Sequence, residues 1–135
     1  MALVLDASIC GSWMLPDESH PLGVRALHRL VDEEAHVPGI WWFEVRNLLL
    51  VNERKGRGSV ENTAAVLHDL KQLHIVEDTA PHSDAILNLA REHRLTFYDA
   101  AYLDLALRRG LTLATLDGRL AEAARAVGVR LLEEG

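Results

Sequence analysis

The sequence holds a single cysteine, Cys10, among its 135 residues, so it can form neither an internal disulfide nor a thiolate metal cluster. Its longest apolar stretches, such as residues 48–51, are far too short to cross a bilayer. No basic segment followed by an apolar core and a cleavage site opens the chain. We therefore expect no secretion signal, no membrane partner and a cytoplasmic protein.

Several catalytic motifs are also missing. The patterns GxxxxGK[ST], GxGxxG and GxSxG do not occur, which disfavours P-loop nucleotide hydrolysis, hydride transfer and serine esterase chemistry. The 7 histidines are scattered without the HExxH or Cys/His spacing of zinc sites. The chemistry of this chain has to be sought elsewhere.

Positive charge is scarce: 14 basic against 20 acidic residues leave a net charge of −6. This balance argues against a protein that coats nucleic acid by bulk electrostatics, but not against an enzyme that holds phosphates through a metal. Arg54, Lys55 and Arg57 form a local basic cluster between glycines. The cluster fits a solvated helix end, where cations are favoured, and it also fits a contact with RNA phosphates.

What the chain does contain is ordinary for a globular protein, with 49% hydrophobic and 25% charged residues. A chain of this length buries roughly two thirds of the surface that its unfolded form exposes. We find no repeat, linker or low-complexity tract, and expect one domain over residues 1–135.

Short apolar runs alternate with stretches of helical spacing along the chain. The runs predict strands at residues 2–5, 36–37, 75–76, 111–115 and 129–132. The helical stretches are a short one before Pro16 and residues 20–34, 40–55, 59–74, 81–94, 99–109 and 118–127. This alternation predicts an α/β fold with a central, mostly parallel sheet flanked by helices on both faces.

Four carboxylates, Asp6, Glu44, Asp99 and Asp117, stand where a predicted strand gives way to a helix or within the first turns of a helix. The carboxyl ends of parallel strands share one edge of a sheet, so these acids are expected to meet there. Two unit charges 4 Å apart repel by about 4 kcal/mol at an effective dielectric of 20. A cluster of four acids therefore predicts a metal site.

Each acid also has a purely structural interpretation. Asp6 is as well placed to cap the following helix as to catalyse, and so is Ser8. Glu44 lies in a very apolar stretch, where a core salt bridge would satisfy it. Asp99 can simply begin its helix, with Thr96 as a competing cap.

The remaining polar positions near these acids are less specific. Asp117 and Gly118 can form a plain turn, with Thr115 capping the last helix. Asn47 follows Glu44 by three residues and shares its helix face. Asp104 falls on a different helix face from Asp99 and is predicted to be more often a surface charge than a site residue.

Short segments of the sequence resemble the PIN-domain family, most closely its VapC-like toxin branch. They are LDAS at residues 5–8, EVRN at 44–47, YDAAY at 98–102 and TLD at 115–117. They occur in the family's order and span nearly the whole chain. The resemblance implies a single PIN-like domain and a metal-dependent endoribonuclease, the toxin of a toxin–antitoxin pair.

The resemblance also implies roles for individual residues and partners. The metal-binding catalytic acids would be Asp6, Glu44, Asp99 and Asp117, with Ser8, Asn47 and Thr115 as polar supporters. All-oxygen ligands suit Mg²⁺ or Mn²⁺ better than Zn²⁺. The implied partners are an RNA substrate, a cognate antitoxin and a second copy of the chain in a homodimer.

Two alternatives remain open at this point. A receiver-like phosphorylation domain also gathers acids at strand ends, but it needs a lysine near its fifth strand, and the two lysines here, Lys55 and Lys71, lie mid-chain. A PIN fold that binds RNA or assembles with partners, with weak or no catalysis, is disfavoured by the presence of all four acids.

The three consecutive aromatic residues Trp41, Trp42 and Phe43 precede Glu44. At about 100° per residue they fan across most of a half-turn of helix. We therefore expect at least one of them to reach the surface, where large aromatics are typical anchors of protein interfaces.

Overall fold

The strand β1 (Ala2–Leu5) lies inside the sheet because Leu3, Val4 and Leu5 are apolar and become completely buried. In the computed structural model, which describes residues 2–133, the strand order is β3-β2-β1-β4 and every pairing is parallel. The strands after β1 are β2 (Glu34–Pro38), β3 (Ile75–Asp78) and β4 (Thr112–Ala114).

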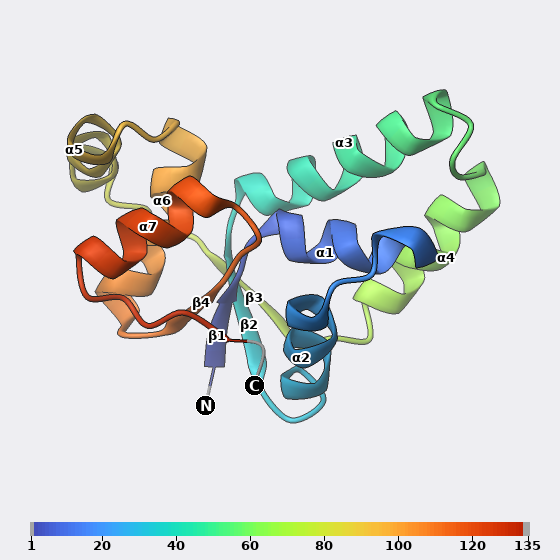
Figure 1. The fold of residues 1–135 in the computed structure, drawn as a ribbon, viewed down its shortest axis with the longest axis horizontal. Coiled ribbons are helices and arrows are strands. Elements are labelled where there is room, and N and C mark those ends of the chain that lie inside the picture. The colour runs from blue at the N-terminus through green and yellow to red at the C-terminus, as the bar shows by residue number, and fades with distance from the viewer. Residues whose placement is uncertain (1, 134–135) are drawn as a thin grey trace.

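Helices connect the strands and cover the sheet. In chain order they are α1 (Ala7–Met14), the 3₁₀ turn η1 (Pro16–Glu18), α2 (Pro21–Arg29), α3 (Ile40–Arg54), α4 (Val60–Leu70), α5 (Ser83–His93), α6 (Phe97–Arg109) and α7 (Gly118–Ala126). Figure 1 shows α5, α6 and α7 on one side of the sheet and α1 to α4 on the other. The predicted α/β class, with a parallel sheet between helices, is confirmed.

Three predicted elements either end more than two residues away from the prediction or are absent. The helix expected over residues 20–34 ends at Arg29, because Glu34 already pairs with β1 as the start of β2. The helix expected over 59–74 ends at Leu70, where a turn leads to β3. Residues 129–132 do not form a strand, because only Leu131 pairs with β4, in an isolated bridge to Leu113.

The aromatic run before Glu44 divides between the core and the surface. Trp41 is completely buried and packs edge-on against Trp42, with ring centroids 5.0 Å apart and planes at 83°. Phe43 is 72% exposed. The expectation that at least one of the three reaches the surface is confirmed.

None of the helices within residues 2–133 combines the length and the apolar character needed to cross a bilayer.

Candidate active site

Asp6 stands at the junction of β1 and α1, at the carboxyl edge of the sheet. Its backbone N–H donates to the carbonyl of Ala114 at the end of β4 (3.0 Å), and its side chain is buried. Its Oδ2 accepts two hydroxyl hydrogen bonds, from Ser8 Oγ (2.7 Å) and Thr115 Oγ1 (2.6 Å). Asp6 occupies the N-cap position of α1, but its side chain makes no capping hydrogen bond. Its carboxylate instead accepts the hydrogen bonds of Ser8 and Thr115.

The same two hydroxyls fasten the turn that follows β4. Ser8 Oγ accepts from the backbone N–H of Leu116 (2.9 Å), and Thr115 Oγ1 accepts from the backbone N–H of Asp117 (3.0 Å). Each hydroxyl therefore donates a hydrogen bond to Asp6 and accepts one from the backbone of the turn. Ser8 and Thr115 thus link the ends of two neighbouring strands around one buried carboxylate.

Glu44 lies in the second turn of α3 and is half-buried. Its Oε1 accepts a short hydrogen bond from the phenol of Tyr102 (2.6 Å), on α6. Within residues 2–133 no ion pair involves Glu44, so the core salt bridge considered from the sequence was wrong and its partner is a neutral hydroxyl.

Tyr102 is the residue of this site that sequence reasoning missed. It lies inside the YDAAY segment, one helical turn after Asp99, and its ring is completely buried. A buried tyrosine hydroxyl needs a polar partner, and that requirement was the available signal. The carboxylate it meets comes from a helix 58 residues earlier in the chain.

Asp99 and Asp117 differ in how their carboxylates are used. Thr96 caps α6 by accepting from the backbone N–H of Asp99 (3.1 Å), so the Asp99 side chain is not needed as the cap. Asp117 does cap α7: its Oδ1 accepts from the backbone N–H groups of Arg119 (2.9 Å) and Leu120 (3.0 Å). Thr115, proposed from the sequence as the cap of α7, serves Asp6 instead.

The carboxylates act on one another electrostatically. Burial is the largest cause that raises the pKa of Asp6, Glu44 and Asp99 above the ordinary carboxyl range. The negative charge of Asp117 raises the pKa of Asp6 further, while the hydroxyls of Thr115 and Ser8 oppose the rise.

The pKa values of Glu44 and Asp99 are also raised by the charges of neighbouring acids. The charges of Asp6 and Asp99 add to burial in raising the pKa of Glu44, and the Tyr102 hydroxyl opposes them. The charges of Asp117 and Asp6 likewise raise the pKa of Asp99. The four predicted acids therefore form one electrostatic centre, which we call the carboxylate centre.

The carboxylate centre is not a closed ligand cage. Within residues 2–133 no group of three or more His, Cys, Asp or Glu side chains is arranged to hold a metal ion directly. Glu44 and Asp117 each use one carboxylate oxygen in hydrogen bonds and leave the other without a hydrogen bond in the described part of the chain. The centre supplies negatively charged oxygen atoms, some of them committed to the protein and some free.

The basic cluster of Arg54, Lys55 and Arg57 is not brought to this centre. It lies at the far end of α3, about 15 Å along the helix from Glu44 at 1.5 Å per residue (Figure 1). Arg57 pairs with Asp17 and Glu18 of η1, each at 2.7 Å. Arg54 and Lys55 are exposed, and so is Asn47, one turn after Glu44.

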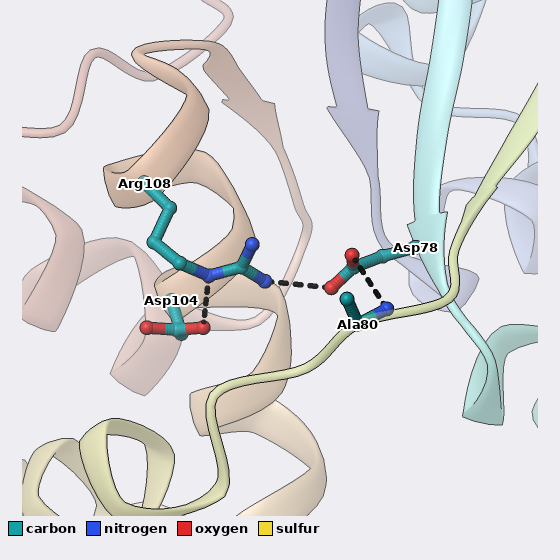
Figure 2. A network of polar contacts seen from close by, with 4 residues as sticks. All are labelled: Asp78, Ala80, Asp104 and Arg108. Carbon is teal, nitrogen blue, oxygen red and sulfur yellow. Dashed lines mark hydrogen bonds and ion pairs between the residues drawn. The ribbon is translucent and has the colours of Figure 1, made fainter.

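Asp104 is not the surface charge that its position on α6 predicted. It is 2% exposed and accepts from Nε of Arg108 (2.7 Å), whose other nitrogen donates to Oδ2 of Asp78 (2.6 Å). Figure 2 shows this guanidinium between the two carboxylates, with the Ala80 backbone N–H donating to Asp78. Asp104 belongs to a buried ion network that joins α6 to the end of β3.

Comparison with known proteins identifies the family of this chain and several relatives. Residues 3–126 match the profile of the PIN domain. The chain is 34% identical over 126 residues to the ribonuclease VapC3 of Pyrobaculum aerophilum, covering 90% of this chain and 94% of that protein. It is 41% identical over 81 residues to the exonuclease VapC9 of the same organism, with 58% of each chain covered.

Solved structures share the fold at lower sequence identity. The crystal structure of PAE2754 from Pyrobaculum aerophilum superposes with a TM-score of 0.73 at 23% identity, covering 98% of this chain and 90% of the other. VapBC2 from Rickettsia felis, solved bound to a DNA fragment from its promoter, gives a TM-score of 0.67 at 18% identity, with 97% of each chain covered. At these identities the likeness extends to the fold alone.

Proposed function

The chain belongs to the PIN-domain family, and from that premise we propose that it is a metal-dependent ribonuclease that cleaves RNA internally, the toxin of a toxin–antitoxin pair acting in the cytoplasm. The observation that carries the proposal is the carboxylate centre. Asp6, Glu44 and Asp99 lie within one another's fields at the carboxyl edge of the sheet, and their pKa values are all raised. The full-length similarity to a ribonuclease supports RNA as the substrate.

The donor set fits a hard divalent cation. It consists of carboxylate oxygens, which are the ligands that Mg²⁺ and Mn²⁺ prefer, and it contains no thiolate or imidazole. Clustered carboxylates with raised pKa values gain stability either by taking up protons or by pairing with a cation. We assign Asp6, Glu44, Asp99 and Asp117 to the cation, through carboxylate oxygens that the hydrogen bonds of the described residues leave free.

The residues around the acids position them. Ser8 and Thr115 hold Asp6 in one orientation, and Tyr102 holds Glu44. Asn47, exposed on the same face of α3 as Glu44, is available to contact the substrate. When bound, the divalent ion neutralises charge on the scissile phosphate and acidifies the attacking water. The protein's own part is to hold the acids and to orient the phosphodiester between them.

The test is cleavage of RNA by purified protein with Mg²⁺ or Mn²⁺ and with EDTA. We expect cleavage with either ion, none in EDTA, and none for Asp6→Asn, Glu44→Gln or Asp99→Asn. Asp84→Asn, which removes an exposed acid from α5, is the matched control and should keep full activity. Cleavage that persists in EDTA would rule out the metal mechanism.

A circular RNA separates internal cleavage from trimming at ends, because a circle has no end to trim. We expect the wild-type protein to open the circle. RNA binding without cleavage by folded protein in Mn²⁺ would instead favour the alternative of a non-catalytic PIN module.

We further propose an antitoxin and a second copy of this chain as protein partners. The VapC-type relatives and the VapBC2 structure support an antitoxin, and the exposed Phe43 offers an anchor. Trp41 was a candidate for this role from the sequence, but it is a core residue whose truncation to alanine should destabilise the fold by about 3–5 kcal/mol.

Phe43→Ser should weaken self-association or antitoxin binding while leaving the melting temperature nearly unchanged. Val60→Ser, at an equally exposed position on α4, is the control, since Val60 is 69% exposed. Light scattering and titration with the antitoxin measure the two interactions. Equal behaviour of the two variants in both would remove Phe43 from the interface.

The contact of Arg54, Lys55 and Arg57 with RNA stays a prediction. The ion pairs of Arg57 with Asp17 and Glu18 leave Arg54 and Lys55 as its more available members. Replacing all three with glutamine and measuring the salt dependence of RNA binding tests it.

A further inference from the structure

A groove lined by arginines runs along the edge strand β4, outside the carboxylate centre. Its walls are α2 and the last turn of α7, and its floor is the segment 129–132 that failed to become a strand. Two hydrogen bonds hold this floor against β4: Leu113 N–H to the carbonyl of Arg130 (2.8 Å) and Leu132 N–H to the carbonyl of Leu113 (2.9 Å). Figure 1 shows the segment after α7, in red, crossing toward α2.

The groove consists of two adjoining hollows. The larger, of about 600 Å³, is lined by Arg25 and Arg29 of α2, by Arg125 of α7 and by Arg130. The smaller, of about 440 Å³, shares Arg125 with the first and reaches Thr115, the residue that holds Asp6. The groove therefore extends along β4 from Thr115, which donates to Asp6, to Thr112 at the other end of the strand.

The charge of the groove is opposite to that of the whole molecule. Among residues 2–133, four arginines line the larger hollow against one acid, Glu133, in a chain of net charge −6. The guanidinium of Arg29 donates two hydrogen bonds to the carboxylate of Glu33. Arg25, Arg125 and Arg130 are exposed and make no ion pair with any residue among 2–133.

The chemistry of the lining points to phosphate groups. Guanidinium groups bind phosphate oxygens in a forked geometry and are more weakly hydrated than ammonium groups. No aromatic side chain lines either hollow, so the groove has no platform on which bases could stack. Contacts to the backbone without contacts to bases position a nucleic acid and do not read its sequence.

We propose that this arginine groove binds the phosphate backbone of the RNA substrate, through Arg25, Arg125 and Arg130, and guides the chain to the carboxylate centre. The proposal rests on the proposed ribonuclease function, and it names the path of the substrate on this protein. The basic cluster at the end of α3 is the competing path. That cluster is distant from the acids, and Arg57 in it is already paired.

The experiment measures binding of a labelled single-stranded RNA in EDTA, where the RNA stays intact, over a range of salt concentrations. The triple variant Arg25→Gln, Arg125→Gln, Arg130→Gln should bind roughly tenfold or more weakly, and its slope of log affinity against log salt should fall by about 2, at 0.7 per phosphate contact. The matched control removes the same charge from three exposed positions elsewhere, with Lys71→Gln, Arg91→Gln and Arg109→Gln. The control should keep the slope.

A substitution that removes a negative charge from the groove provides a second test. Glu133→Gln removes the acid that lines both hollows in the described part of the chain, and it should tighten RNA binding. In the metal-loaded enzyme the groove variant should raise KM with little change in kcat, because its residues bind substrate without touching the reacting atoms. Melting temperatures within a few degrees of wild type would show that all variants are folded.

The outcomes separate the two proposals. Wild-type protein that binds RNA through the groove but never cleaves it would overturn the ribonuclease function and leave the groove standing. Wild-type cleavage with unchanged KM and salt slope in the groove variant would overturn the groove alone. Unchanged RNA affinity together with lost antitoxin binding would assign the groove to a protein and overturn it as an RNA site.

Discussion

At the residue scale, the phenol of Tyr102 is the polar group on which the orientation of Glu44 depends. The hydroxyl is buried with its ring, and both burial and the neighbouring carboxylate raise the pKa of Tyr102, so it remains a donor at any physiological pH. Within residues 2–133 this hydroxyl is the only hydrogen-bond donor to Oε1 of Glu44. Because Glu44 is half-buried, water can replace that donor only in part.

Tyr102→Phe should therefore lower the free energy of unfolding by about 1–2 kcal/mol at neutral pH, measured by urea denaturation. The Tyr102 hydroxyl lowers the pKa of Glu44, so the deficit should shrink as the pH falls and Glu44 takes up a proton. Tyr98→Phe is the control, since Tyr98 is 55% exposed on the same helix. Equal losses for the two variants would argue against a structural role of the hydrogen bond.

Asp117 combines a capping bond with a place in the carboxylate centre, and two substitutions separate these roles. Asp117→Asn keeps the acceptor oxygen that caps α7 but removes the charge, so stability should stay level or rise in the metal-free protein. Asp117→Ala also removes the cap and should lower the free energy of unfolding by about 1 kcal/mol.

Thermal melts with and without Mn²⁺ measure the loss of the cap and the loss of the metal ligand. If Asp117 ligates the ion, the two variants should lose the stabilisation by Mn²⁺ to the same extent. An asparagine variant as unstable as the alanine variant would contradict the assignment of the cap to Oδ1.

At the element scale, the ion network of Arg108 fixes α6, which carries Asp99 and Tyr102, to the end of β3. The side chains of Asp104 and Asp78 are 3% and 4% exposed, so removal of the cation would leave two buried charges unpaired. Losing one partner of a buried ion pair is far more damaging than losing an exposed pair.

Arg108→Met should thus destabilise the protein by about 3 kcal/mol or more in urea denaturation. Arg109→Met, at the exposed neighbouring position, should have almost no effect. Converting Asp104 and Asp78 to asparagine in the Arg108→Met background should restore part of the loss, since no buried charge then remains. Failure of that rescue would show that the guanidinium acts through packing rather than charge.

At the scale of the whole molecule, the carboxylate centre sets how the stability of the metal-free protein depends on pH. The folded pKa values of Asp6, Glu44 and Asp99 lie above their ordinary values of 3.8, 4.5 and 3.8. A raised carboxyl pKa means that folding favours the protonated form. The resulting stability is complete below the ordinary values and is lost as the pH rises through the folded ones.

The melting temperature of EDTA-treated protein should therefore fall as the pH rises above the ordinary carboxyl values toward neutrality, and Mn²⁺ should restore it at neutral pH. The pair of Glu33 with Arg29 works in the other direction, because Arg29 lowers the pKa of Glu33 and its stabilisation is lost in acid. Asp6→Asn should flatten the pH dependence, and Asp84→Asn should leave it unchanged. A melting temperature that rises steadily toward neutrality without metal would contradict the mutual repulsion of the acids.

The α/β architecture was predictable from the sequence, and so was the position of Asp6 at the carboxyl edge of the sheet. Buried parallel strands consist of short apolar runs, and acids at strand ends must share an edge once the sheet is parallel. Leu3, Val4 and Leu5 carry the first signal, and Asp6 directly after them carries the second. Because these features are local, the sequence alone was enough to predict the fold class and the position of Asp6.

Contacts between side chains that are distant in the sequence could be found only in the folded structure. Tyr102 finds Glu44 across 58 residues, and Arg57 finds Asp17 across 40. Asp104 is buried next to Arg108, which also binds Asp78, and the arginine groove brings together residues of α2, α7 and the segment 129–132. Periodicity and composition carry no record of such pairings, because they arise when elements distant in sequence pack together.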